Sequence, residues 1–247
     1  MRRTGYQRRQ TGGSGKPSSG KATARPPGRI RIIAGRFRGR RIPVVDLPGL
    51  RPTPERTRET LFNWLQGHLD GARVLDLFAG SGALGFEALS RGASEVVLVE
   101  KDRRACQQLR EVAASLDQGR CRVVQADALA WPRSQEQAFD LILIDPPFAA
   151  SLAVAALAHV HARKLLAAGG RVYCEASTQE MPAPWEPPES GPPESGPPES
   201  GPPESGPPES GRWEVLRETD AGDSHGALLA LASGEAKKSA KNVDVQK

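Results

Sequence analysis

The chain has 247 residues, 38% of them hydrophobic, enough for one core of about 170 residues with the remainder in tails. No run approaches the ~18 apolar residues of a membrane span, and no apolar segment follows the arginine-rich start as in a secretory signal. These features predict neither a membrane-spanning helix nor a secretory signal. The three cysteines lack metal-ligand spacing, which predicts reduced thiols, a cytoplasmic protein and no structural metal.

The net charge of +5 is unevenly distributed along the chain. Residues 1–41 contain thirteen Lys or Arg and no acid, whereas the rest has 21 basic against 29 acidic residues, a net charge of −8. A cationic arm on a mildly acidic body is typical of a nucleic-acid-binding protein. Residues 1–28, rich in Gly, Ser and Pro, are expected to form a disordered basic tail, and a merely solubilising role stays open.

Two short apolar pieces within 29–45 flank a segment rich in arginine, which predicts a β-hairpin with a basic tip around Phe37. Such a tip suits phosphate contacts plus one stacking surface, although an ordinary solvated hairpin is the alternative. A helix is expected next, with Thr53 as its N-cap and Pro54 at its first position. Its apolar face reaches His68, which is expected to be a capping or surface residue.

The body of the chain alternates strand and helix patterns, which predicts a doubly wound parallel sheet with right-handed crossovers. The expected strands are 73–78, 95–100, 121–125, 140–145 and 170–176; the expected helices are 83–91, 103–116 and 150–167, with a turn or short helix at 128–133. Two further strands, 213–219 and 226–232, are expected to close the sheet as an antiparallel hairpin.

A repeat, Pro-Pro-Glu-Ser-Gly five times over 187–211, interrupts this pattern. Two prolines per unit remove N–H donors, so the repeat is expected to be an extended, disordered surface insertion. A neutral insertion is favoured over a partner-binding role. The lysine-bearing tail 234–247 is also expected to be flexible.

The segment Val74–Gly85 reads as a buried strand that breaks into glycines before a helix. Gly80–Gly85 fits the G-x-G-x-x-G pattern of a dinucleotide site, but that pattern alone is weak. Asp76 inside the strand and the Asp-Pro-Pro-Phe motif at 145–148 shift the interpretation. Together they resemble an S-adenosylmethionine (SAM) methyltransferase that acts on an exocyclic amine.

Several longer segments resemble one family, the bacterial 16S ribosomal RNA guanine-N2 methyltransferases of the RsmD type. They are Arg31-Ile-Ile-Ala-Gly35, Gly49-Leu-Arg-Pro-Thr53, Arg58-Glu-Thr-Leu-Phe-Asn-Trp-Leu65, Asp76–Gly85, Glu87-Ala-Leu-Ser-Arg-Gly-Ala93 and Asp145-Pro-Pro-Phe148. The resemblance runs from about residue 29 to 178 and resumes weakly at 213–232. The Asp-Pro-Pro-Phe motif occurs in many amino-methyltransferases, whereas the segments at 49–53 and 58–65 are far more specific. The basic arm and the proline repeat depart from the family.

The resemblance implies an α/β, Rossmann-like class I methyltransferase fold. Its seven-stranded, mostly parallel sheet would carry an antiparallel edge hairpin and a small N-terminal β-hairpin and helix extension. The methyltransferase domain would span 29–233, with the extension at 29–70. The implied partner is 16S rRNA within the 30S subunit or its assembly intermediates, bound by a monomer.

Positions within the fold assign expected cofactor roles. The backbone of the glycine turn would wrap the methionine part of SAM, over Phe78, Ala79, Gly80, Ser81 and Gly82. Asp76 would orient this turn or meet the ammonium group. Glu100, ending the second strand, would accept the ribose hydroxyls, and Asp127, with the N–H of Ala128, would bind the adenine. Helix capping is the alternative role for both acids.

Methyl transfer is assigned to Asp145, Pro146, Pro147 and Phe148. The Asp145 carboxylate and the Pro146 carbonyl would accept hydrogen bonds from an amine, the prolines would stiffen the turn, and Phe148 would stack on a splayed-out base. No metal is required. RNA contacts are expected from Arg31, Arg36, Phe37, Arg38 and Arg40, and the resemblance adds Arg51, Thr53 and Arg58 for RNA phosphates or cofactor. Arg58 pairing with a neighbouring acid is the alternative.

These features predict SAM-dependent methylation of a guanine N2 in 16S rRNA. An N6-adenine methyltransferase acting on DNA or RNA would use the same acceptor pair. A non-catalytic RNA-binding ribosome assembly factor is the alternative from a different class, and a nicotinamide oxidoreductase fits least well.

Overall fold

The computed structural model describes residues 28–45, 53–131, 138–147, 152–177 and 212–232. The expected basic tail up to residue 27, the repeat at 187–211 and the tail 234–247 lie outside these ranges, as do Arg51 and Phe148. In the part of the chain described, no helix has the length and apolarity to cross a bilayer.

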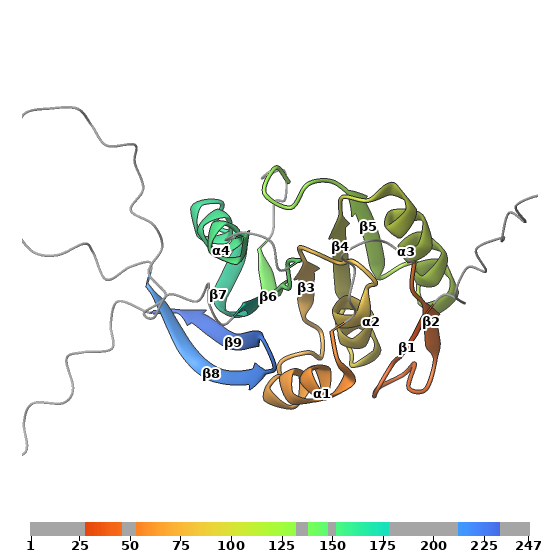
Figure 1. Ribbon diagram of the computed structural model, residues 1–247, viewed down its shortest axis with the longest axis horizontal. Coiled ribbons are helices and arrows are strands. Elements are labelled where there is room, and N and C mark those ends of the chain that lie inside the picture. The colour runs from red at the N-terminus through yellow and green to blue at the C-terminus, as the bar shows by residue number, and fades with distance from the viewer. Residues whose placement is uncertain (1–27, 46–52, 132–137, 148–151, 178–211, 233–247) are drawn as a thin grey trace, which may run out of the picture.

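A seven-stranded sheet in the order β5-β4-β3-β6-β7-β9-β8 forms the centre of the molecule (Figure 1). The strands are β3 (Arg73–Asp76), β4 (Glu95–Glu100), β5 (Cys121–Gln125), β6 (Phe139–Ile144), β7 (Leu166–Ser177), β8 (Trp213–Ala221) and β9 (Ser224–Leu231). The first five run parallel, and β9 is antiparallel to both β7 and β8. The prediction of a mostly parallel sheet with an antiparallel edge hairpin is confirmed.

The order of the strands creates a switch point between β3 and β6. The chain proceeds from β3 outward to β4 and β5, then crosses back to place β6 on the other side of β3. Connections diverge at such a point, so the carboxyl ends of the two strands border a crevice where ligands bind in open α/β sheets.

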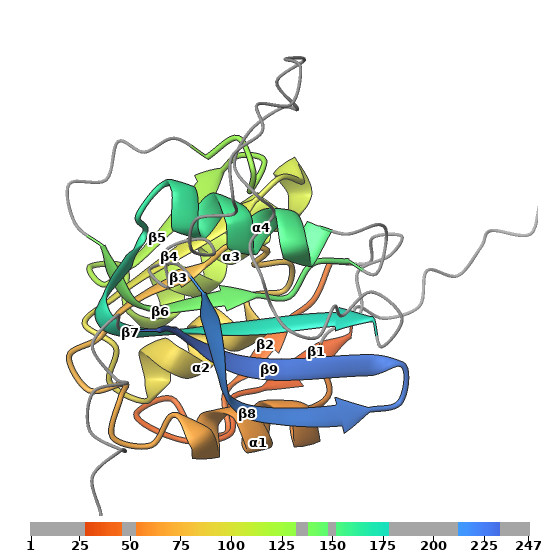
Figure 2. The ribbon, with the colours of Figure 1, turned by 90° about the vertical axis from the view of Figure 1, so that its left-hand side faces the viewer.

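Helices cover both faces of the sheet (Figure 2). Helices α1 (Glu55–Trp64), α2 (Ala83–Ser90) and α3 (Arg103–Leu116) pack on one face, and α4 (Leu152–Ala162) packs on the other. Successive strand residues point to opposite faces, so Val74 joins the core beneath α2 while Leu75 joins the core beneath α4. The two cores together fix the strand ends that carry the polar side chains.

An N-terminal hairpin, β1 (Arg29–Arg31) paired with β2 (Arg41–Pro43), docks on α2. The carboxylate of Glu87 accepts the N–H groups of Ile33 and Ala34 at 2.7 and 3.0 Å. Gly35 has a φ of +79°, and a Cβ there would lie 1.9 Å from the Ser90 carbonyl oxygen. Only glycine therefore allows this close approach.

Three expected boundaries are wrong. Pro54, not Thr53, is the N-cap of α1, because the Thr53 hydroxyl bonds elsewhere. Helix α1 ends at Trp64, which leaves His68 exposed beyond it. The helix expected to reach residue 167 ends at Ala162, because Lys164 turns the chain with a φ of 51° and the apolar residues from Leu166 onward enter β7 instead.

Candidate active site

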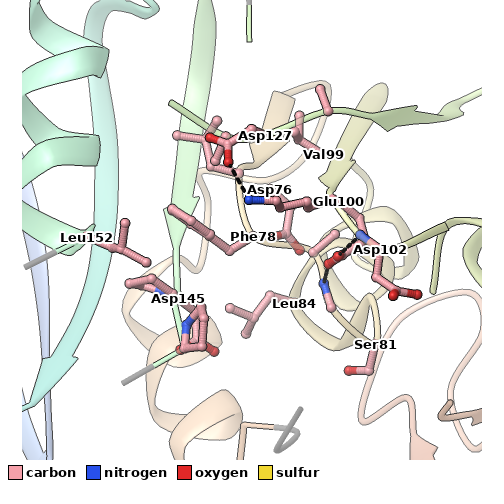
Figure 3. Close-up of a pocket in the computed structure, with 18 of the residues that line it drawn as sticks. Asp76, Phe78, Ser81, Leu84, Val99, Glu100, Asp102, Asp127, Asp145 and Leu152 are labelled. Carbon is pink, nitrogen blue, oxygen red and sulfur yellow. Dashed lines mark hydrogen bonds and ion pairs between the residues drawn. The ribbon is translucent and has the colours of Figure 1, made fainter. Parts of the chain in front are cut away.

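A cavity of about 800 Å³ lies at the carboxyl ends of β3, β4, β5 and β6, at the switch point. Its volume is in the range of small-molecule sites. The residues that line it are Thr53, Asp76–Ser81, Ala83, Leu84, Val99–Arg103, Gln125–Leu129, Asp145–Pro147 and Leu152. Asp145 and Leu152 lie on one side, and Glu100 and Asp102 on the other (Figure 3). Residues of both sequence motifs, Asp76–Ser81 and Asp145–Pro147, thus meet in one cavity.

The glycine turn between β3 and α2 is shaped by two left-handed residues. Gly80 has a φ of +50° and Gly82 a φ of +77°. The N–H of Gly80 donates to Glu100 Oε2 at 2.8 Å, so it is used within the protein. Gly82 is the N-cap of α2 and does not line the cavity, and a Cβ there would lie 2.4 Å from the Phe86 ring. Gly82 therefore shapes the turn, whereas Phe78, Ala79, Gly80 and Ser81 line the cavity.

Asp76 is a buried acid at the end of β3. Its Oδ2 accepts the N–H of Gly85 at 3.1 Å, and its Oδ1 has no hydrogen-bond partner among the described residues. Burial raises the pKa of this carboxyl to about 7, and the charge of Glu100 adds to the rise. An unpaired buried carboxylate oxygen is costly, so a cationic group beside Asp76 would be stabilised there.

Glu100 and Asp127 both make local contacts. Glu100 accepts the N–H of Asp102 at 2.7 Å as well as that of Gly80. Asp127 accepts from Lys101 Nζ and from the N–H of Leu129, both at 3.0 Å, and the Lys101 contact lowers its pKa. The helix N-cap is Asp102, which accepts from Arg104 and Ala105, so Glu100 is not the cap of α3.

Asp145 follows β6 directly and faces the cavity beside Pro146 and Pro147. Its Oδ2 accepts a hydrogen bond of 2.6 Å from the hydroxyl of Thr53. Burial raises the pKa of Asp145 to about 8, helped by the charges of Glu175 and Asp76, while the Thr53 hydrogen bond acts in the opposite direction. The turn therefore holds a carboxyl that titrates near neutral pH.

Glu175 is a further carboxylate whose charge acts on Asp145, and the sequence analysis did not single it out. It is buried at the end of β7, the strand beside β6, and accepts hydrogen bonds from the hydroxyls of Tyr173 (3.0 Å) and Ser224 (2.7 Å). It ends the apolar run Val172–Cys174, the same strand-end placement that pointed to Glu100. That rule would have found it.

Two residues expected at the RNA, Phe37 and Arg58, are buried in the structure. The ring of Phe37 is 7% exposed and belongs to the core, with Arg36 and Arg40 stacked over it at 5.2 and 5.9 Å, so it offers no free face to a base. Arg58 is 3% exposed and lies 3.8 Å from Glu87, so it cannot reach an RNA phosphate. Its alternative role, pairing with a neighbouring acid, is the one observed.

The other arginines of the hairpin are exposed. Arg31 pairs with Glu55, Arg36 pairs with Asp117 at 3.0 Å, and Arg40 donates to the Ser115 carbonyl at 2.9 Å. Arg38 is exposed at the tip. Thr53, expected at the RNA or the cofactor, lines the cavity and donates a hydrogen bond to Asp145. Among the residues that the structure describes, no group of His, Cys, Asp or Glu is arranged to hold a metal ion.

Sequence comparison assigns the chain to a known family. The family model described as "Conserved hypothetical protein 95" matches residues 30–187. The chain belongs to this family. It is 43% identical over 162 residues to Ribosomal RNA small subunit methyltransferase D of Escherichia coli strain K12, covering 64% of this chain and 82% of that protein. The Haemophilus influenzae protein of the same name is 41% identical over 161 residues, covering 62% and 81%.

Solved structures agree with this assignment. The yhhF protein of Escherichia coli superposes with a TM-score of 0.63 at 37% identity, covering 82% of this chain and 97% of that one. A Thermus thermophilus protein superposes with a TM-score of 0.60 at 29% identity, covering 81% and 98%. The family is thus RsmD-like, as the sequence motifs indicated, and the fold is a Rossmann-like class I methyltransferase fold.

Proposed function

We propose that this chain transfers a methyl group from SAM to the exocyclic N2 of a guanine in 16S rRNA of the small ribosomal subunit. The observation that carries the proposal is that Asp145 and Pro146 border the same cavity as Gly80 and Glu100. Hydrogen-bond acceptors for an amine, at Asp145 and Pro146, thus border the same cavity as the residues that would hold a nucleoside. The names of the relatives support rRNA of the small subunit as the substrate.

The residues present fit SAM better than a dinucleotide. Five acids line the cavity: Asp76, Glu100, Asp102, Asp127 and Asp145. Of the described residues, only two basic ones, Lys101 and Arg103, line it as well. This charge suits a sulfonium and an ammonium group and opposes a pyrophosphate. The N–H of Gly80, which a phosphate would need, already donates to Glu100. Asp76 Oδ1, which has no partner among the described residues, offers an acceptor for the ammonium group.

In this proposal each residue has one task. SAM, when bound, supplies a methyl group activated by a sulfonium. Glu100 would hold the ribose hydroxyls, and Asp127 with the N–H of Ala128 would hold the adenine. Asp145 and the carbonyl of Pro146 would accept the two hydrogens of the guanine amine, aligning its lone pair and stabilising the charge that develops on nitrogen. Phe148 would stack on the flipped base.

Replacing Asp145 by alanine tests the proposal. We expect Asp145→Ala to lower kcat for small subunits by about 10²–10³-fold, because one aligned acceptor is removed, with SAM binding retained. Asp145→Asn, which keeps one acceptor oxygen, should retain more activity than alanine. Asp223→Ala, in the exposed β8–β9 turn, is the control and should match the wild type. Calorimetry measures SAM binding, and labelled methyl incorporation measures turnover. Equal loss of binding and turnover in Asp145→Ala would reject the assigned role.

A further inference from the structure

The hydroxyl of Thr53 makes a contact that the proposed reaction does not yet use. Thr53 lies outside the sheet, directly before α1, and is 9% exposed. It reaches across 92 positions of sequence to donate a 2.6 Å hydrogen bond to Asp145 Oδ2. A hydroxyl bound to one carboxylate oxygen leaves the other oxygen as the acceptor for an incoming amine. The contact therefore selects which oxygen of Asp145 is free.

Thr53 is itself held in place by a buried arginine. Arg58 Nε donates to the Thr53 carbonyl at 3.3 Å, and the same guanidinium donates to the Arg31 carbonyl at 3.1 Å. Arg58 lies 3.8 Å from Glu87, whose other contacts fix the hairpin on α2. Thr53 is thus anchored to the extension and to the helix behind the glycine turn.

We propose that Thr53 is a positioning residue for methyl transfer, whose hydroxyl holds the Asp145 carboxylate in the orientation that accepts the target amine. The inference rests on the proposed function. It also gives the N-terminal extension a part in the chemistry, because the extension supplies the group that orients the transfer corner. A side chain locked by a second hydrogen bond keeps the sub-ångström placement that such alignment needs.

The hydrogen bond also affects the protonation of Asp145. The titratable groups around it are Asp76 on β3 and Glu175, Tyr173 and Cys174 on β7. Asp76 and Glu175 favour the protonated form of Asp145, whereas the donated Thr53 hydrogen bond favours the carboxylate. Loss of the hydroxyl should therefore raise the pKa of Asp145.

Thr53→Val removes the hydroxyl and keeps the shape of the side chain. We expect kcat for small subunits to fall about tenfold or more, with KM for subunits and Kd for SAM within about twofold of wild type. The acid limb of the pH profile of kcat should move to higher pH. Thr53→Ser should rescue both readouts. Thr57→Val, a buried threonine of α1 that does not line the cavity, is the matched control.

The outcomes separate this inference from the proposed function. If the wild-type protein methylates small subunits and Thr53→Val matches it in kcat and in pH profile, the positioning role of Thr53 is overturned, whereas the proposed function stands. Wild-type protein that does not methylate small subunits overturns the proposed function. The Thr53 contact is then judged from a ¹³C titration of the Asp145 carboxyl, in which an unchanged pKa in Thr53→Val refutes it. If the Thr53→Val variant does not unfold cooperatively, each measurement uses Thr53→Ala, which also lacks the hydroxyl group.

Discussion

Single carboxylates in the cavity carry the chemistry in the proposed function, and their burial also has a cost in stability. Asp76 and Asp145 lie at the ends of the neighbouring strands β3 and β6, and burial raises the pKa of each carboxyl, to about 7 and about 8. An acid whose folded pKa exceeds its unfolded value favours folding only while it is protonated. Stability is therefore lost as the pH rises from the unfolded pKa near 4 through the folded pKa.

Asp76→Asn tests this cost directly. The amide cannot ionise, so the variant should gain free energy of unfolding relative to the wild type, by roughly 2 kcal/mol more at pH 8 than at pH 5. Binding of SAM should weaken in the same variant, because the negative charge that would face a cation is removed. Urea unfolding at the two pH values measures the first effect. An equal difference at both pH values would show that Asp76 is not protonated in the folded protein.

The residue scale also shows where sequence reasoning was sufficient. Asp76, Glu100, Asp127 and Asp145 were placed from their positions at strand ends, and all four line one cavity. Side-chain direction was harder to predict. An aromatic residue among arginines read as a stacking surface, yet Phe37 packs inward because the hairpin needs an apolar anchor on the core. The hydrophobic period and the spacing of residues do not predict which way the side chain of a loop residue faces.

At the scale of elements, α2 connects the cofactor side and the N-terminal extension. Glu87 on its inner face accepts from Ile33, Ala34 and Arg91 and lies close to Arg58, with the carboxylate 0% exposed. Contacts of this kind join segments that are far apart in the sequence, and no local sequence pattern predicts them. The Thr53–Asp145 contact was missed for the same reason, although both residues had been singled out.

Glu87→Ala should loosen the hairpin and destabilise the protein by about 3–5 kcal/mol, since Arg91 and two N–H groups would lose a buried acceptor and Arg58 would lose its counter-charge. Glu111→Ala, on the exposed side of α3, is the control and should change stability by about 0.5 kcal/mol or less. Chemical denaturation gives both values. A Glu87→Ala variant as stable as the control would mean that the hairpin is held mainly by its apolar residues.

Across the whole molecule, acidic and basic residues are concentrated in different places. The charged residues that line the cavity are mainly acids, whereas the thirteen basic residues of 1–41 lie at the start of the chain. Six arginines of the described hairpin are exposed: Arg29, Arg31, Arg36, Arg38, Arg40 and Arg41. The sequence showed this segregation directly, because charge counting needs no knowledge of packing. The mostly parallel sheet also followed from the alternation of strand and helix patterns, whereas its strand order comes from the structure.

Removing residues 1–28 should weaken RNA association and make its salt dependence shallower. The segment carries seven Lys or Arg, and the slope of log K against log salt falls by about 0.7–0.9 for each phosphate that is no longer neutralised. Deleting 187–211, a segment of similar length with five Glu and no basic residue, is the control and should leave slope and activity unchanged. Filter binding over a salt series provides the slopes. Equal slopes for the first deletion and the full chain would show that the arm makes no phosphate contacts.

The central claim is that one cavity brings a SAM methyl group to a guanine amine. The most direct measurement uses the purified full chain, SAM and small subunits from an Escherichia coli strain lacking its methyltransferase D, followed by nucleoside mass spectrometry of the RNA. The account predicts one new methylated nucleoside, N2-methylguanosine. The appearance of N6-methyladenosine instead, or of no methylated nucleoside, would contradict it.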